Sequence, residues 1–286
     1  MNAPTNAAEG IGHRPDGPAF EVPADACDCH MHLFDTRLPF AAGAGLTHGD
    51  ASPDEYRALQ RRLGLTRNVI VQPSSYGRDH RVLRAGLRAF GAQVRGVAVV
   101  GPDVDDAELS ELHAAGVLGT RFNLVQHGAT GEAMLEAVAQ RIRPLGWHVQ
   151  VHLHPADLLR WSDRLVSLPV PVVIDHFARV HADPELAQRV QTCVDDLLAT
   201  GRVWLKLSAP YIACGGDAPP DALGPFVRGL VQRHPDRLLW GTDWPHVTEA
   251  HKPDDARLMN LLAAWLPDAG ARQRILVDNP HVLYRF

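Results

Sequence analysis

Short apolar runs alternate with longer amphipathic stretches from about residue 26 to the end of the chain. Eight such runs occur, and most of them are apolar on both sides of an extended chain, as parallel strands covered on both faces are. We expect strands over 26–29, 68–71, 94–100, 119–122, 148–151, 171–174, 203–207 and 238–240. Their recurrence along the chain predicts one repeated strand–helix unit.

The stretches between these runs have apolar residues three or four positions apart, which is the period of an amphipathic helix. In 133–143, for example, Met134, Val138 and Ile142 fall on one face. Helices are expected over 53–63, 79–90, 105–115, 133–143, 156–168, 183–199, 223–232 and 258–266. Eight strands that alternate with helices predict an α/β protein whose sheet closes into a (β/α)8 TIM barrel.

An open doubly wound sheet is the main alternative architecture. Such a sheet usually binds a nucleotide at a glycine-rich turn after its first strand, and residues 28–35 have no such glycine pattern. A (β/α)8 barrel commonly forms one domain of about 250 residues, so we assign residues 25–286 of the 286-residue chain to it. Residues 1–24 are rich in Ala, Pro, Gly and Asn without apolar periodicity, which predicts a flexible tail or a surface arm.

Bulk composition argues against several classes of function. A net charge of −5 does not favour a nucleic-acid or anionic-membrane partner. The chain has no apolar run long enough for a transmembrane helix, and its N-terminus lacks the regions of a secretory signal. The four cysteines form no Cys-x-x-Cys pair, which favours buried reduced thiols. We therefore expect a cytoplasmic enzyme, monomeric or homodimeric, with a small-molecule partner.

Side chains suited to chemistry follow the ends of the expected strands. In (β/α)8 barrels the carboxyl ends of the strands meet at one mouth, and active sites lie there. The residues at these ends include His30, His32, Ser74, Arg121, Asn123, His152, Asp175, His176, Ser208 and Asp243. Four histidines, an arginine and aspartates at one mouth predict a catalytic or metal site.

His30, His32 and Asp243 carry most of this prediction. The two histidines are two residues apart on a strand, so their side chains share a face, as metal ligation or contact with one substrate oxygen requires. A carboxylate at Asp243 suits a base for water or a metal ligand, although Pro245 also allows a helix N-cap there. His152 and His176 suit the same site, and a hydrogen bond in the core is the alternative for His176.

Arg121 is the expected clamp for a substrate carboxylate, because a guanidinium binds a carboxylate through two parallel hydrogen bonds. A salt bridge that shapes the barrel rim is its alternative. Six other histidines lie in expected helices or loops and are predicted to be surface residues: His80, His113, His181, His234, His251 and His281.

Several strand-end motifs together resemble the amidohydrolase superfamily, and within it the 2-pyrone-4,6-dicarboxylate lactonase group. They include Asp-Cys-His-Met-His-Leu-Phe at 28–34, Asn-Val-Ile-Val-Gln-Pro at 68–73, Arg-Phe-Asn at 121–123, Val-Ile-Asp-His at 173–176, Trp-Gly-Thr-Asp-Trp-Pro-His at 240–246 and Val-Asp-Asn-Pro at 277–280. The resemblance begins near Ala26 and does not cover the N-terminal tail.

The resemblance implies a distorted barrel that hydrolyses a lactone without a divalent metal. Asp243 would activate water, and His30, His32 and His176 would polarise the lactone carbonyl. Arg121 would anchor a substrate carboxylate, and Ser74 would be a further substrate contact.

This chain departs from the lactonase pattern at three substrate-binding positions. His127 stands where the group has a second arginine, the segment Ser208 to Ile212 with Tyr211 replaces a third, and His152 replaces a tyrosine. Fewer cationic clamps favour a lactone with one carboxylate or a sugar-acid lactone. We expect His152 and Tyr211 to contact that substrate, with Tyr211 bonded to a neutral group.

His152 also leaves a metal-dependent alternative open. His30, His32, His152 and Asp243 form a ligand set suited to one zinc ion. The alternatives to a metal-independent lactone hydrolase are therefore a lactone isomerase on the same site, a mononuclear zinc hydrolase or decarboxylase, and a barrel that only binds a carboxylated ligand.

Overall fold

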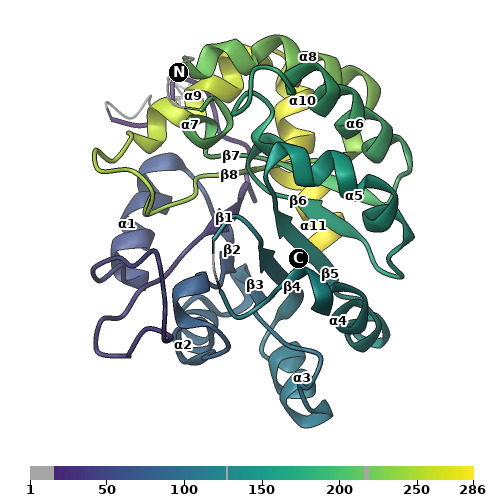
Figure 1. Ribbon diagram of the computed structural model, residues 1–286. Helices are drawn as coiled ribbons and strands as arrows, with labels where there is room; N and C mark the ends of the chain where they lie inside the picture. The colour runs from purple at the N-terminus through teal and green to yellow at the C-terminus, as the bar shows by residue number, and fades with distance from the viewer. Residues whose placement is uncertain (1–15, 127, 216–218) are drawn as a thin grey trace, which may run out of the picture.

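The computed structural model describes residues 16–126, 128–215 and 219–286, and within them eight parallel strands surround a central axis (Figure 1). The strands are β1 (Cys27–Met31), β2 (Arg67–Val71), β3 (Val94–Ala98), β4 (Val117–Asn123), β5 (His148–His152), β6 (Val172–Ile174), β7 (Val203–Ser208) and β8 (Leu238–Gly241). Each pairs with the next in chain order. Main-chain bonds from the amides of His32 and Asp243, to the carbonyls of Trp244 and His30, close the ring between β1 and the end of β8. The predicted (β/α)8 barrel is confirmed.

Helices cover the outside of the strands, and most lie where the apolar spacing predicts them. They are α1 (Pro53–Leu63), α2 (Arg81–Phe90), α3 (Asp106–Ala114), α4 (Leu135–Ile142), α5 (Pro155–Ser167), α6 (Ala187–Ala199), α7 (Pro210–Ala213), α8 (Gly224–Arg233), α9 (Asp255–Trp265), α10 (Ala269–Gln273) and α11 (Asn279–Tyr284). The short helices α7, α10 and α11 were not predicted. They are too short to display a helical period.

Two helix starts show how local chemistry sets a boundary. Helix α1 begins at Pro53 as expected, because Ser52 and Glu55 form a reciprocal capping box. Helix α6 begins four residues later than expected, at Ala187. Asp183 holds the amides of Glu185 and Leu186 in a turn, at 3.0 and 3.3 Å, and so delays the helix.

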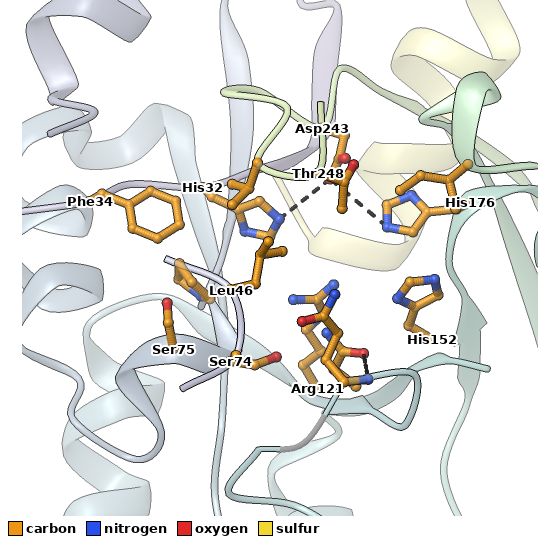
Figure 2. A pocket seen from close by; sticks show the side chains of 16 residues that line it. His32, Phe34, Leu46, Ser74, Ser75, Arg121, His152, His176, Asp243 and Thr248 are labelled. Atoms are coloured by element: carbon orange, nitrogen blue, oxygen red, sulfur yellow. Dashed lines mark hydrogen bonds and ion pairs between the residues drawn. The ribbon is translucent and has the colours of Figure 1, made fainter. Parts of the chain in front are cut away.

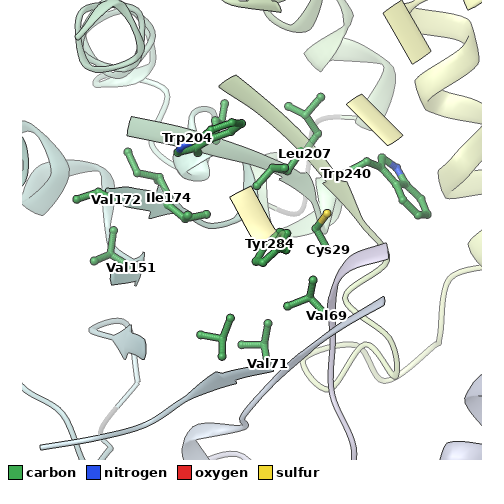
Figure 3. Close-up of a cluster of buried hydrophobic side chains, with 14 of the residues drawn as sticks. Cys29, Val69, Val71, Val151, Val172, Ile174, Trp204, Leu207, Trp240 and Tyr284 are labelled. Atoms are coloured by element: carbon green, nitrogen blue, oxygen red, sulfur yellow. The ribbon is translucent and has the colours of Figure 1, made fainter. Parts of the chain in front are cut away.

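The C-terminal helix α11 closes the barrel at the amino ends of the strands. Tyr284 is fully buried, and its ring lies 5.5 Å from that of His148 at the start of β5. Figure 3 shows it beside Cys29 within the apolar core. The main chain of Tyr284 accepts a hydrogen bond from Arg95 of β3 at 3.0 Å. Because α11 covers this end, the cavity of the barrel opens to solvent at the carboxyl ends of the strands.

The segment before β1 lies along the barrel as far as the structure describes it. The amide of Ala19 donates to Asn260 of α9 at 2.7 Å, and Arg62 of α1 donates to the carbonyl of Asp16 at 2.7 Å. The remainder of the predicted tail, residues 1–15, falls outside the described residues. Among the described helices, none combines the length and apolarity needed to cross a membrane.

One predicted surface histidine is buried, so that prediction was wrong for His80. The residue is 6% exposed, with Nε2 2.9 Å from the carbonyl of Val99 and Nδ1 3.0 Å from Glu108. These partners come from the β3–α3 segment, and the sequence around His80 gives no sign of them. His251 and His281 are exposed as expected, and His113, His181 and His234 are half-buried.

Candidate active site

A cavity opens at the carboxyl ends of the strands, as the barrel predicts (Figure 2). Six of the predicted site residues line it, and they come from segments that end six different strands: His32, Ser74, Arg121, His152, His176 and Asp243. All except the half-buried Ser74 are buried. His30 lies just beneath, fully buried, and Tyr211 lies behind Asp243 without lining the cavity. The tertiary structure therefore brings all eight predicted residues into one region.

Asp243 stands at the centre of this group. Its Oδ1 lies 3.4, 3.6 and 3.9 Å from Nε2 of His32, His30 and His176, respectively. Its Oδ2 accepts a hydrogen bond from the Tyr211 hydroxyl at 2.9 Å. Its backbone has φ +67°, a left-handed conformation that side-chain-bearing residues seldom adopt. One carboxylate thus faces three imidazoles through one oxygen and a phenol through the other.

The helix N-cap considered for Asp243 does not occur. The next described helix after β8 is α9, and Asp254 caps it by accepting from the amide of Arg257. Burial by itself raises the pKa of Asp243, but the imidazoles of His176, His32 and His30 outweigh it and hold the pKa well below its usual range. The carboxylate is therefore ionised at neutral pH and able to accept a proton.

The histidines around Asp243 are oriented by partners that face away from the cavity. Nδ1 of His32 lies 2.7 Å from the carbonyl of Val71, which can only accept, so Nδ1 carries a hydrogen and Nε2 faces Asp243. Nδ1 of His176 lies 2.9 Å from the hydroxyl of Ser208. Burial lowers the pKa of both His30 and His176, although the carboxylates of Asp175 and Asp243 oppose this effect.

His152 has no hydrogen-bond partner at either ring nitrogen among the described residues. Its ring stands perpendicular to that of His176, with centroids 4.7 Å apart, and its side chain is directed into the cavity (Figure 2). A buried polar group without a partner is costly. A ligand in the cavity is the natural partner for this ring.

The turn that presents His176 is strained. Four consecutive residues, His176 to Arg179, have φ between +52° and +56°. A left-handed conformation costs non-glycine residues about 1–2 kcal/mol each, and such strain concentrates where function requires a fixed geometry. The turn places the imidazole of His176 against Asp243.

A second buried polar cluster, sealed beneath the cavity, surrounds Asp175. Lys206 Nζ donates to Gln150 at 2.7 Å and lies 3.4 Å from Nδ1 of His30. Asp175 accepts from Gln150 at 3.0 Å and lies 3.2, 3.5 and 3.8 Å from His30, Arg121 and Lys206. Arg121 therefore makes the salt bridge considered for it, and its guanidinium also lines the cavity.

Lys206 and His246 were missed by the sequence analysis, although each carried a signal. Lys206 is one of two lysines in the chain and interrupts an otherwise apolar strand. His246 ends the segment that contains Asp243, and both its ring nitrogens have partners: the half-buried Tyr211 at 2.9 Å and the buried Asp255 at 3.0 Å. The predicted substrate contact of Tyr211 stays a prediction, and His127 falls outside the described residues.

Known proteins resemble this chain over nearly its whole length. The amidohydrolase family profile matches residues 27–286. The chain is 38% identical to a 2-pyrone-4,6-dicarboxylate hydrolase of Comamonas testosteroni, over 94% of this chain and 93% of that protein. It is 33% identical to a D-galactarolactone isomerase of Agrobacterium fabrum, with the same coverage. An apo crystal structure from Agrobacterium tumefaciens superposes with a TM-score of 0.86 at 30% identity, covering 94% of this chain and 98% of that one.

Proposed function

Because the chain belongs to the amidohydrolase family, we propose that it is an enzyme that opens a carboxylate-bearing lactone by hydrolysis. The observation that carries this proposal is the carboxylate of Asp243 on the cavity wall, with three imidazole Nε2 atoms within 3.9 Å of one of its oxygens. The two curated relatives described above are both named for reactions of lactones.

The reaction needs one base and one group that stabilises negative charge. Arg121 binds the substrate carboxylate, and the imidazoles polarise the lactone carbonyl. Asp243 takes a proton from water while the oxygen of that water adds to the carbonyl carbon. The ring C–O bond then breaks, and the departing ring oxygen receives the proton from Asp243, which leaves a hydroxy acid and an ionised base.

The cavity favours a substrate with a single carboxylate. Among the described residues that line it, Arg121 is the only lysine or arginine. Neutral polar side chains, Asn123 and Gln126, and the apolar Ile212 and Val247 supply much of the remaining wall. A lactone with one carboxylate, or a sugar-acid lactone with hydroxyl groups, therefore fits this wall better than a ring with two carboxylates.

Isomerisation of a sugar-acid lactone is the second candidate. His152 favours it, because this residue lines the cavity and both its ring nitrogens are buried without partners among the described residues, so they suit a substrate hydroxyl. In this reaction a second hydroxyl of the lactone adds to the carbonyl carbon while Asp243 takes its proton. The original ring C–O bond then breaks, and the departing ring oxygen receives that proton. The product is a new lactone with no net release of acid.

A metal-dependent reaction is the third candidate, and the donor set fits one ion. His30, His176 and Asp243 place one donor atom each within 4.8 Å of one another, and Nε2 of His30 is buried without a hydrogen-bond partner among the described residues. A divalent ion held there would supply Lewis-acid activation of water or of the carbonyl. His32 and His152, both part of the ligand set expected from the sequence, are not in this group, and His176, which was not expected there, is.

A panel of lactones tests these candidates: 2-pyrone-4,6-dicarboxylate, D-galactarolactone and simple monocarboxylated lactones. Proton release in weakly buffered solution, followed by NMR of the product, separates hydrolysis from isomerisation. Elemental analysis and activity before and after chelation decide whether an ion is needed. Ligand binding without turnover, unchanged in Asp243→Asn, would instead identify a barrel that only binds its ligand.

A further inference from the structure

A chain of three side chains runs from Asp243 away from the cavity. The Tyr211 hydroxyl donates to Oδ2 of Asp243 at 2.9 Å and lies 2.9 Å from Nδ1 of His246. Nε2 of His246 lies 3.0 Å from Oδ1 of Asp255, the first residue of α9. His246 is 2% exposed and Asp255 is 6% exposed. The contact between His246 and Asp255 is therefore shielded from bulk water, while Tyr211 is half-buried. None of these three residues lines the cavity.

Hydrogen counting orders this chain. A phenol has one hydroxyl hydrogen. Because Tyr211 donates this hydrogen to Asp243, the Tyr211 oxygen must accept a hydrogen bond from Nδ1 of His246. Asp255 accepts on the far side of the imidazole. A ring with hydrogens on both nitrogens satisfies both neighbours, so each member fixes the rotamer of the next.

We propose that Tyr211, backed by His246 and Asp255, is a positioning residue for the base. It holds Oδ2 of Asp243 so that Oδ1 stays directed at the three imidazoles and at the water to be activated. This inference rests on the proposed function. It differs from a substrate contact because the hydroxyl of Tyr211 is already occupied on both sides and acts through Asp243. A catalytic carboxylate must be held within a fraction of an ångström of its productive position by such supporting bonds.

The first test is Tyr211→Phe, assayed with whichever lactone of the panel the wild type opens. We expect kcat to fall by about 10- to 100-fold with KM within about twofold, because one hydrogen bond to a charged group is lost from the base only. A rise in KM with unchanged kcat would overturn the proposal and identify Tyr211 as a substrate contact. Tyr284→Phe is the matched control, because it removes a buried hydroxyl at the closed end of the barrel.

A double-mutant cycle tests whether Asp255 acts through Tyr211. Asp255→Asn alone should lower kcat by a few fold, and in the Tyr211→Phe background it should lower kcat no further. Additive losses would overturn the proposed chain. Thermal unfolding of each variant separates these effects from loss of fold. If the residues had only a structural role, kcat would fall in step with the melting temperature.

An infrared measurement tests the same contact without turnover. The difference spectrum between wild type and Asp243→Asn isolates the carboxylate stretch of Asp243. Tyr211→Phe should shift that band, and Tyr284→Phe should leave it in place. An unshifted band overturns the inference even where no lactone is opened, whereas a shifted band with no lactone opened retains the contact and rejects the proposed function.

Discussion

Two buried carboxylates inside the barrel, Asp175 and Asp243, share His30 as a neighbour but otherwise have different surroundings. Asp175 is sealed beneath the cavity and packs against Lys206, Arg121 and Gln150. Asp243 reaches the cavity, with 7% of its side chain exposed. Its neighbours there are imidazoles and a phenol, with no lysine or arginine within salt-bridge distance among the described residues.

The difference shows that burial alone does not make a base. Burial raises the pKa of Asp175, but His30 and the Lys206 ammonium outweigh it and hold the pKa well below its usual range. Because Lys206 and Arg121 are cationic partners of Asp175, a proton on Asp175 would leave their charges uncompensated. The neighbours of Asp243 can donate or accept hydrogens, so this carboxylate can exchange a proton with water during a reaction.

Among the changes that test this difference, Asp243→Asn should have the largest effect, a loss of kcat. It keeps the shape of the side chain and removes the proton acceptor, so kcat should fall by about 10²–10⁴-fold. Steady-state kinetics with a turned-over lactone measure it, and Asp103→Asn at an exposed site is the control. A loss of less than tenfold would assign the base to another residue.

Asp175→Asn should act on stability instead. It leaves Lys206 and Arg121 buried without their carboxylate, and removal of one partner from a buried ion pair costs about 3–5 kcal/mol of unfolding free energy. Urea unfolding monitored by circular dichroism measures the loss. Adding Lys206→Met should recover part of the lost unfolding free energy, because it removes one of the two buried charges that Asp175→Asn leaves unpaired. An unfolding free energy equal to that of wild type would show that the sealed cluster is energetically neutral.

Acid should destabilise the barrel at pH values well above those at which carboxylates usually titrate. Burial, assisted by the charge of Lys206, lowers the pKa of His148 to about 3. Between pH 3 and the unfolded value of about 6.5, the unfolded chain binds more protons, so stability rises with pH across this window. His148 alone should therefore remove about 2 kcal/mol between pH 7 and pH 5.

Urea unfolding at pH 7 and pH 5 measures this loss, with His148→Gln as the comparison. The variant should lose about 2 kcal/mol less than wild type over the same interval. Equal losses in the two proteins would mean that His148 is protonated in the folded state.

The smallest expected effect belongs to Ser74, which is half-buried at the cavity rim. Ser74→Ala removes one neutral hydrogen bond to the substrate, worth about 1 kcal/mol, so KM should rise by about fivefold with kcat unchanged. Ser110→Ala, on the exposed face of α3, is the control. A change in kcat instead would place Ser74 in contact with the reacting atoms.

The apolar pattern alone was enough to predict the barrel and the mouth at which its polar residues gather. Strand period and strand order place His32, Arg121, His152 and Asp243 at one end of a closed sheet, whatever their side chains do there. Start signals such as Ser52 and Pro53 set a helix boundary correctly, because the capping atoms lie within a few residues.

Tertiary structure decided which atoms face one another. The partners of Tyr211, Lys206 and His80 come from distant segments. The metal-capable group contains His176 and lacks His32 and His152, which the expected ligand set included. Sequence spacing states which face of a strand a side chain occupies, but the rotamer and the partner across the barrel follow from packing. The same pattern of apolar and polar residues is compatible with several such pairings, and only the packed interior selects one.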